Sequence, residues 1–135
     1  MNEQLASTLK QAGYSVTKPR QAVFSALQSG KPRGMRELTL DLSSVIDRAS
    51  IYRTVELFEK LGVVVRVQSG WKYKIELSDA FLPHHHHLTC TGCGKIISFD
   101  EPNGLEDVLQ TIALEHGFAA KDHSLEISGL CSDCC

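Results

Sequence analysis

Apolar side chains recur at helical spacing through residues 3–61. Ile51, Val55 and Phe58 stand at i, i+4 and i+7, a spacing that puts three side chains on one face of a helix. Glycines and capping residues mark where each apolar stripe begins and ends. The pattern predicts four helices, which run over residues 3–12, from a Thr17 cap to Gly30, over residues 35–42, and from an Asp47 cap to about Leu61.

The periodicity then changes to that of strands. Residues 63–67 and 72–77 are rich in β-branched and aromatic side chains, and Gln68-Ser69-Gly70 between them favours a turn. Three or four helices followed by a hairpin describe a winged helix-turn-helix. In that arrangement the fourth helix enters the major groove of DNA and the hairpin lies along the phosphates.

The remainder of the chain predicts a second, smaller unit. After a hinge at residues 78–83, strands are expected near 85–90, 95–99 and 124–128, with a helix from about Asn103 to His116. Exposed strand edges and small size favour pairing with a second copy, so we expect a homodimer. The predicted fold class is α+β, and the domains are a winged-helix DNA-binding domain at 1–77, the hinge at 78–83 and a metal-binding dimerisation domain of α/β type at 84–135.

Charge separates the two halves of this 135-residue chain. Residues 1–75 carry 12 Lys and Arg against 6 Asp and Glu, and residues 76–135 carry 2 against 10. The net charges are therefore +6 and −8, which make up the −2 of the whole chain. Chance segregation is the alternative, but the contrast favours a module that binds a polyanion joined to one that binds metal. No apolar run approaches the ~20 residues that span a bilayer, so no membrane contact is expected.

Two Cys-x-x-Cys pairs supply the first metal-binding candidates. Cys90 and Cys93 form one pair, and Cys131 and Cys134 the other, which together provide four thiolates for a tetrahedral zinc site. Disulfides or unrelated thiols are the alternative. No signal peptide opens the chain, so we expect a reducing, cytoplasmic location, which disfavours disulfides. Cys135 stands beside the second pair, and spacing alone does not decide between Cys134 and Cys135 as the fourth ligand.

Four consecutive histidines, His84 to His87, run directly into the first cysteine pair. An affinity-tag remnant or a solvated run is the alternative, but a tag is not expected inside a chain and next to Cys90. If the run is an extended strand, His84 and His86 point to one face and His85 and His87 to the other. One strand can therefore serve two metal sites.

In combination, these motifs resemble the ferric uptake regulator (Fur) family of metal-responsive repressors. The resemblance spans nearly the whole chain. It is carried by Val16–Arg20, Arg48–Val55, His84–Lys95, His116–Phe118 and Asp122–Cys131.

The resemblance implies a homodimer that binds a palindromic operator in double-stranded DNA. It implies one structural Zn²⁺ per chain at Cys90, Cys93, Cys131 and Cys134. It also implies that a second metal at the hinge locks the DNA-binding domains into the operator's spacing. Tyr52 and Arg53 match the family's base-contacting and phosphate-contacting pair, and Arg20 matches a backbone contact. The candidate DNA-binding residues are Arg20, Ser50, Tyr52, Arg53 and Thr54.

Two regulatory metal sites are implied by the same resemblance. The preferred one consists of His84, His86, Glu106 and His123, a set that suits Fe²⁺ or Zn²⁺, with Mn²⁺ or Ni²⁺ as further candidates. The other consists of Glu76, His85 and His87. It is incomplete, because Pro32 and Ser98 stand where the family usually has a His and an acid.

Three functions are compatible with these features. The leading one is a metal-dependent repressor of metal homeostasis genes, which takes no small organic substrate. A metal-buffering or metal-delivery protein is the alternative, but the basic half and the side chains of Tyr52 and Arg53, off the apolar stripe, argue against it. A zinc hydrolase would need a general base beside an open metal position. Glu76 or Glu106 could act as that base, but the sequence indicates no nucleophile and no substrate pocket, so no enzyme is expected.

Overall fold

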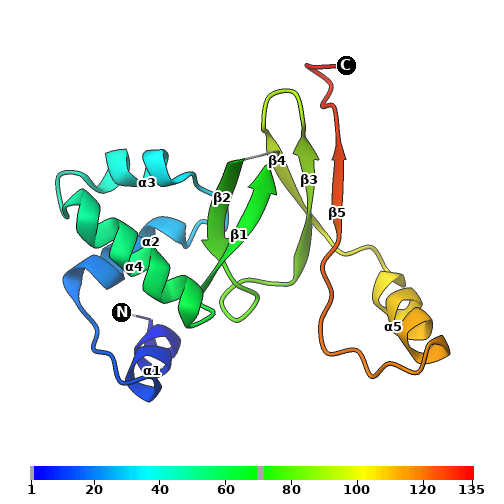
Figure 1. The fold of residues 1–135 in the computed structure, drawn as a ribbon, viewed down its shortest axis with the longest axis horizontal. Coiled ribbons are helices and arrows are strands. Elements are labelled where there is room, and N and C mark those ends of the chain that lie inside the picture. Colours follow the sequence, from blue (N-terminus) through cyan, green and yellow to red (C-terminus); the bar gives the residue numbers. More distant parts are fainter. Residues whose placement is uncertain (1, 70–71) are drawn as a thin grey trace. The chain divides into compact units, whose positions relative to one another are not determined.

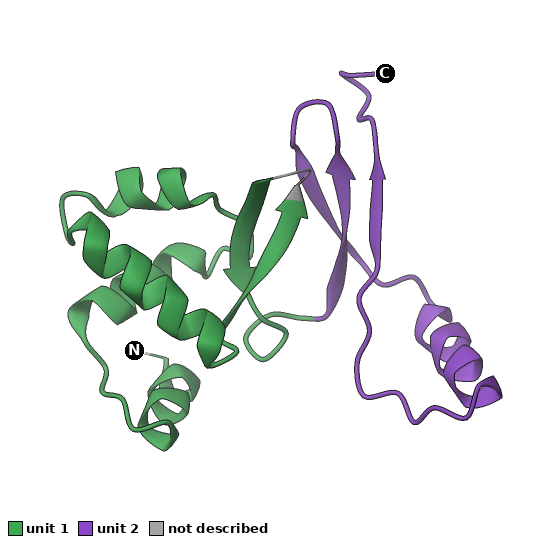
Figure 2. Cartoon of the chain, viewed as in Figure 1, with its two compact units in different colours: residues 1–83 green, residues 84–135 purple. Residues whose placement is uncertain are grey.

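The computed structural model describes residues 2–69 and 72–135. The chain forms two compact units, residues 1–83 and residues 84–135, which are described separately (Figure 2). None of the helices in the described ranges is long and apolar enough to cross a bilayer.

The first unit is a helical bundle followed by a two-stranded hairpin (Figure 1). The helices that start at Lys18 and Arg48 begin at capping side chains: Thr17 accepts a hydrogen bond from the amide of Arg20, and Asp47 from that of Ser50. The predicted winged-helix arrangement is confirmed. Gly70, in the predicted turn, lies outside the described residues. The elements are α1 (Glu3–Gln11), α2 (Lys18–Leu27), α3 (Met35–Leu42), α4 (Arg48–Lys60), β1 (Val64–Ser69) and β2 (Lys72–Leu77), with the two strands antiparallel.

One hydrophobic core holds the first unit together. The α4 side chains predicted to face inward, Ile51, Val55 and Phe58, are all buried, and Leu5 and Leu9 of α1 join them. Burial of these apolar side chains fixes which face of α4 remains outside. The rest of the core is Val23, Phe24, Leu27, Leu38, Ile46, Val63, Val64, Ile75 and Leu77.

Residues 78–83 pack onto this first unit. The Ser78 amide donates to the Val63 carbonyl at 2.9 Å, and the ring of Phe81 contacts Phe24 edge-on at 5.2 Å between centroids. Leu82 lies against Gly30. The boundary between the units therefore falls between residues 83 and 84, and the hinge at 78–83 stays a prediction.

The second unit is a three-stranded sheet with one helix. The central strand β3 (His85–Cys90) pairs antiparallel with β4 (Ile96–Asp100) and parallel with β5 (Glu126–Gly129). The helix α5 (Leu105–Glu115) lies in the connection from β4 to β5, which carries β5 to the other edge of β3, where it pairs parallel with that strand (Figure 1).

The second unit buries very little apolar surface. Cys90 is its one buried hydrophobic residue, and its other buried side chains are His86, His87 and Thr89. No residue of α5 is buried, and Val108 and Ile112, which stand four residues apart on one face of this helix, are 55% and 48% exposed. A unit of this size needs another source of stability than a core of its own.

The core of the first unit can be tested by truncating one side chain. Phe58→Ala is expected to lower the free energy of unfolding by about 3–5 kcal/mol, because Phe58 is fully buried and the substitution leaves a cavity. Val65→Ala, at an exposed position of β1, is the control and is expected to cost less than about 0.5 kcal/mol. Denaturant unfolding followed by far-ultraviolet circular dichroism measures both. Equal losses would show that α4 does not form the core.

Candidate functional site

The four cysteines of the two Cys-x-x-Cys pairs come together in the second unit. Cys90 ends β3, Cys93 lies in the following turn, and Cys131 and Cys134 follow β5. Their sulfur atoms all lie within 4.8 Å of one another. Gly92 is part of this packing, because a Cβ there would stand 3.1 Å from the Cys134 sulfur. The turn therefore admits only glycine without a shift of the cluster.

The electrostatics of the cluster favour a bound cation. The amides of Cys131 and Cys93 donate to the Cys90 sulfur at 3.3 and 3.4 Å, and they lower the pKa of that thiol to about 6. Hydrogen bonding with Cys131 and the other thiols raises the pKa of Cys134 to about 12. Four thiols at this spacing do not all ionise unless a cation lies among them. The donor set thus fits Zn²⁺.

Cys135 lies outside this group. Its thiol donates to the Leu130 carbonyl at 3.6 Å, and its side chain is exposed. Among the described residues, the cluster of four contains Cys134 in its place. Spacing in the sequence had left this choice open, because it depends on how the chain turns after β5.

Three imidazoles meet on one side of β3. The Nε2 atoms of His84 and His123 are 3.2 Å apart, and the rings of His84 and His86 are 4.8 Å apart between centroids. Glu106, in the first turn of α5, lies 3.3 Å from both His84 and His123. Glu106 therefore contacts His84 and His123, but among the described residues the group whose ligand atoms all lie within 4.8 Å of one another contains Glu101 in its place, so the preferred set stays a prediction.

Glu101 is a further residue of this site that sequence reasoning missed. Its carboxylate lies 3.1 Å from His86 Nε2, 3.8 Å from His84 Nε2 and 3.7 Å from His123 Nε2. The signal was available in the strand register: β3 pairs His86 with Phe99, so Glu101 comes level with His84.

The ionisation of Glu101 reflects these contacts. Burial opposes its charged form, but hydrogen bonds with His86 and Glu106 outweigh that effect and lower the pKa of the carboxyl group. The contact with Glu106 means that two carboxyl groups share this side of the site. A divalent cation bound there would neutralise both.

The opposite face of β3 carries His85 and His87. Their rings are 4.8 Å apart between centroids. The register pairs His87 with Ser98, the position at which the family usually has an acid. Glu76 is buried in β2 of the first unit. Because Glu76 belongs to the other unit, the grouping of these three residues stays a prediction.

Arg20, one of the predicted DNA-contacting residues, lies in α2, and the other four lie in the first two turns of α4. Tyr52 is 41% exposed, and the guanidinium of Arg48 lies over its ring at 5.5 Å. Arg53 donates to the Ser50 hydroxyl at 3.2 Å, and that hydroxyl donates to Asp47 at 2.6 Å. The hydrogen bond from Ser50 lowers the pKa of Asp47. This chain of contacts fixes the orientation of Arg53.

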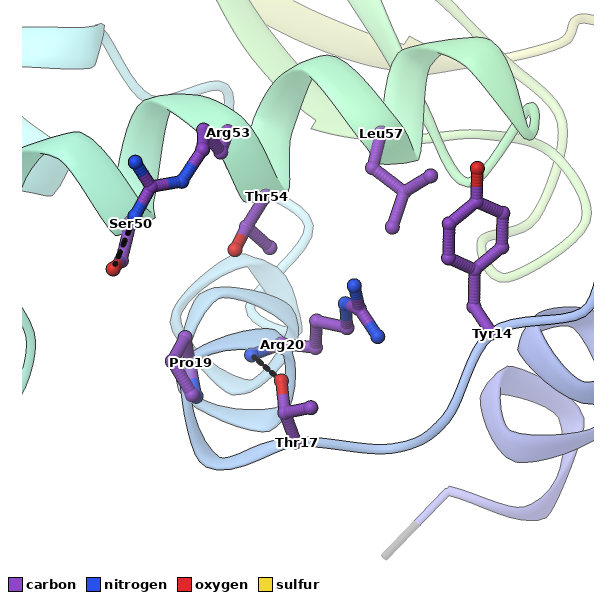
Figure 3. A pocket seen from close by; sticks show the side chains of 8 residues that line it. All are labelled: Tyr14, Thr17, Pro19, Arg20, Ser50, Arg53, Thr54 and Leu57. Atoms are coloured by element: carbon purple, nitrogen blue, oxygen red, sulfur yellow. Dashed lines mark hydrogen bonds between the residues drawn. The ribbon is translucent and has the colours of Figure 1, made fainter.

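A pocket of about 290 Å³ opens between α2 and α4 (Figure 3). Arg20 and Arg53 supply its positive charge, and Thr54, which is buried, forms part of its wall. Arg20 is held in place because it donates to the Ser15 carbonyl at 2.6 Å and lies over the Tyr14 ring at 5.4 Å. Two guanidinium groups and several hydroxyls suit an oxyanion such as a phosphate of DNA. The lining is Tyr14, Thr17, Pro19, Arg20, Ser50, Arg53, Thr54 and Leu57.

Comparison with known proteins agrees with both units. Residues 11–128 match the ferric uptake regulator family. The chain is 32% identical over 141 residues to the ferric uptake regulation protein of Campylobacter jejuni, a similarity that covers 98% of this chain and 87% of the relative. The chain is 33% identical over 129 residues to the ferric uptake regulation protein of Yersinia pestis, a similarity that covers 91% of this chain and 85% of that relative.

A solved structure extends the similarity to the fold. The Helicobacter pylori ferric uptake regulator, described as having three functional metal binding sites, superposes with a TM-score of 0.81 at 26% identity, over 98% of this chain and 89% of that one. Proteins of this family are metal-responsive transcriptional regulators and not enzymes, as expected here. On its sequence and its structure, this chain belongs to the ferric uptake regulator family.

Proposed function

We propose that this chain is a homodimeric, metal-dependent repressor that binds a palindromic operator when its His/Glu site in the second unit holds a divalent cation. The observation that carries the proposal is the meeting of His84, His86 and His123 with two carboxylates, within a chain whose first unit is a winged helix. As a regulator acting on DNA, it would work in the cytoplasm.

The four-cysteine cluster has a structural role in this proposal. Cys90 ends β3, and Cys131 follows β5, so a Zn²⁺ held there would connect these two strands and the turn that follows β3. That connection matters because Cys90 is the one buried hydrophobic residue of the unit. We assign the cluster one tightly held zinc per chain.

The His/Glu site supplies the response to metal. His84 directly follows the boundary between the units, Glu106 opens α5, and His123 lies between α5 and β5. Ligation of one cation would draw α5 and the segment after it onto β3. Because no residue of α5 is buried, its position is free to depend on that ligation. A cation that binds the ordered form better shifts the population toward it.

The ligand types restrict the sensed metal to first-row divalent ions. Imidazole and carboxylate suit Fe²⁺, Zn²⁺, Mn²⁺ and Ni²⁺, and we propose Fe²⁺ or Zn²⁺ first, in keeping with the family. The set of Glu76, His85 and His87 is proposed as a second, weaker site that contributes to the response.

Dimerisation is supported by the apolar surface of the second unit. Leu88 pairs with Ile97 on one side and Ile127 on the other, and all three side chains are exposed. Val108 and Ile112 of α5 are exposed as well. A continuous apolar row on a sheet of this size would be covered by a second copy.

A metal-buffering protein remains the competing function. It would need the histidines and cysteines but no DNA-binding surface. The orientation of Arg53 by Ser50 and the arginine-lined pocket favour DNA binding. Retention of a specific operator only in the presence of metal would separate the two functions.

The structural zinc is tested by Cys90→Ser. This variant is expected to lose the one zinc per chain and to become monomeric, because the thiolate that joins β3 to the cluster is gone. Metal analysis and analytical ultracentrifugation measure both properties. Cys135→Ser is the matched control and should keep both zinc and dimer. A folded, dimeric, zinc-free Cys90→Ser protein would refute the assignment.

The sensor site is tested by His123→Ala. It should abolish metal-dependent operator binding while the structural zinc remains, whereas His85→Ala should only reduce the response. The measurement is operator affinity with and without saturating metal. His116→Ala, at the exposed end of α5, is the control and should respond as the unchanged protein does. If His123→Ala keeps its metal-dependent operator binding while His85→Ala loses it, the sensor is the face of β3 that carries His85 and His87.

The DNA surface is tested by comparing two substitutions in α2 and α4. Arg20→Ala should weaken binding to operator and random DNA alike, because a phosphate contact carries no sequence information. Tyr52→Ala should chiefly erode discrimination, by ~1–3 kcal/mol if it contacts a base. Lys10→Ala on α1 is the control. Fluorescence anisotropy measures the affinity of each variant for operator and for random DNA. If Tyr52→Ala loses the same affinity for both DNAs, Tyr52 only positions the helix.

A further inference from the structure

We infer that Glu101 is a fifth protein ligand of the sensor cation, and that it makes the site prefer six-coordinate cations such as Mn²⁺ and Fe²⁺ over tetrahedral Zn²⁺. The inference rests on the proposed function, since it concerns the cation held by His84, His86 and His123. It adds a ligand outside the preferred set, and it narrows the proposed choice between Fe²⁺ and Zn²⁺ to Fe²⁺, with Mn²⁺ also ahead of Zn²⁺.

The position of Glu101 follows from the sheet. The antiparallel register of β3 and β4 sets His86 opposite Phe99 and ends with His85 opposite Asp100. Glu101 is the next residue of the β4 side and comes level with His84, the residue before β3. A ligand supplied from the end of a paired strand is held more firmly than one on a loop.

The distances place Glu101 within reach of the same cation as the three imidazoles, with one contact inside the usual spacing of neighbouring ligands and two a few tenths of an ångström beyond it. Neighbouring ligands with metal bonds of about 2.1 Å lie about 3.0–3.4 Å apart in tetrahedral or octahedral geometry. Glu101 Oε1 stands 3.1 Å from His86 Nε2, and 3.8 and 3.7 Å from the Nε2 atoms of His84 and His123. It therefore faces all three imidazoles at once.

Burial separates the two carboxylates of the site. The side chain of Glu101 is 18% exposed and that of Glu106 is 44% exposed, while His86, which contacts Glu101, is 2% exposed. A carboxylate withdrawn from water is costly unless it is paired. The three imidazoles offset that cost only in part when they are neutral, so a divalent cation is the fitting partner of Glu101.

The number of donors determines the selectivity. Three imidazoles and one carboxylate already complete a tetrahedral zinc shell. A second carboxylate leaves zinc with one protein ligand too many, whereas a six-coordinate cation can use both. Carboxylate oxygen also suits Mn²⁺ better than the softer cations. Because zinc otherwise binds such donor sets more tightly than Mn²⁺ or Fe²⁺, geometry of this kind is what can offset its advantage.

The test uses the full-length dimer with its cysteine site loaded with Zn²⁺. Co²⁺ is titrated into the remaining site as a spectroscopic probe, since tetrahedral Co²⁺ absorbs visible light strongly and five- or six-coordinate Co²⁺ weakly. Mn²⁺ and Zn²⁺ affinities are measured by chelator competition. The variants are Glu101→Gln, Glu101→Asp and His123→Ala, with Glu115→Gln at the exposed end of α5 as the matched control.

We expect weak Co²⁺ absorption in the unchanged protein and in Glu115→Gln. Glu101→Gln should absorb strongly and lose at least about 10-fold in Mn²⁺ affinity with a smaller loss for Zn²⁺, since even outer-shell changes cost 10–100-fold in metal affinity. Glu101→Asp should change in the same direction, because it keeps the charge but withdraws the carboxylate. Retention of the cysteine-bound zinc and of the dimer verifies that each variant is folded.

Two contrary results have different meanings. If Glu101→Gln and Glu101→Asp keep the unchanged Co²⁺ spectrum and Mn²⁺ affinity while His123→Ala loses the metal, Glu101 is not a ligand and the proposed function stands. If His123→Ala also binds metal and responds normally on the operator, the site itself is wrong, and the inference falls with it.

Discussion

The second unit lacks an apolar core of its own, and its organisation depends on side chains that bind metal. Cys90 is its one buried hydrophobic residue, whereas the buried positions beside it are His86, His87 and Thr89. One small sheet and a helix with no buried residue offset little of the entropy lost on folding. Bonds from thiolate and imidazole to metal therefore take the place that hydrophobic packing has in the first unit.

The two units thus differ in what stabilises them, and this difference bears on function. The first unit is held by apolar burial, so its helix α4 can present Tyr52 and Arg53 whatever the metal supply. The second unit has two clusters with different ligand chemistry, and only the cluster of imidazoles and carboxylates has a contact from α5, through Glu106. A structural cluster of thiolates and a responsive cluster of imidazoles and carboxylates can thus coexist on one strand, β3, without competing for the same ions.

The sequence predicted the structure best where the spacing of residues within one helix or strand determines which face a side chain occupies. Helical spacing found the core face of α4, and strand alternation separated His84 and His86 from their neighbours. Two features needed the folded chain. The turn after β5 determines that Cys134 and not Cys135 joins the described cluster, and the β3–β4 register brings Glu101 to the histidines. Both depend on pairing between distant segments, for which residue spacing alone gives no measure.

The central claim is that cation binding at the His/Glu site and operator binding stabilise the same conformation. Thermodynamic linkage makes this coupling reciprocal, so the most direct measurement is the affinity of the zinc-loaded dimer for Mn²⁺ with and without saturating operator DNA. The account predicts that operator DNA tightens Mn²⁺ binding by the same factor by which Mn²⁺ tightens operator binding. Equal Mn²⁺ affinities in the presence and absence of operator would contradict it.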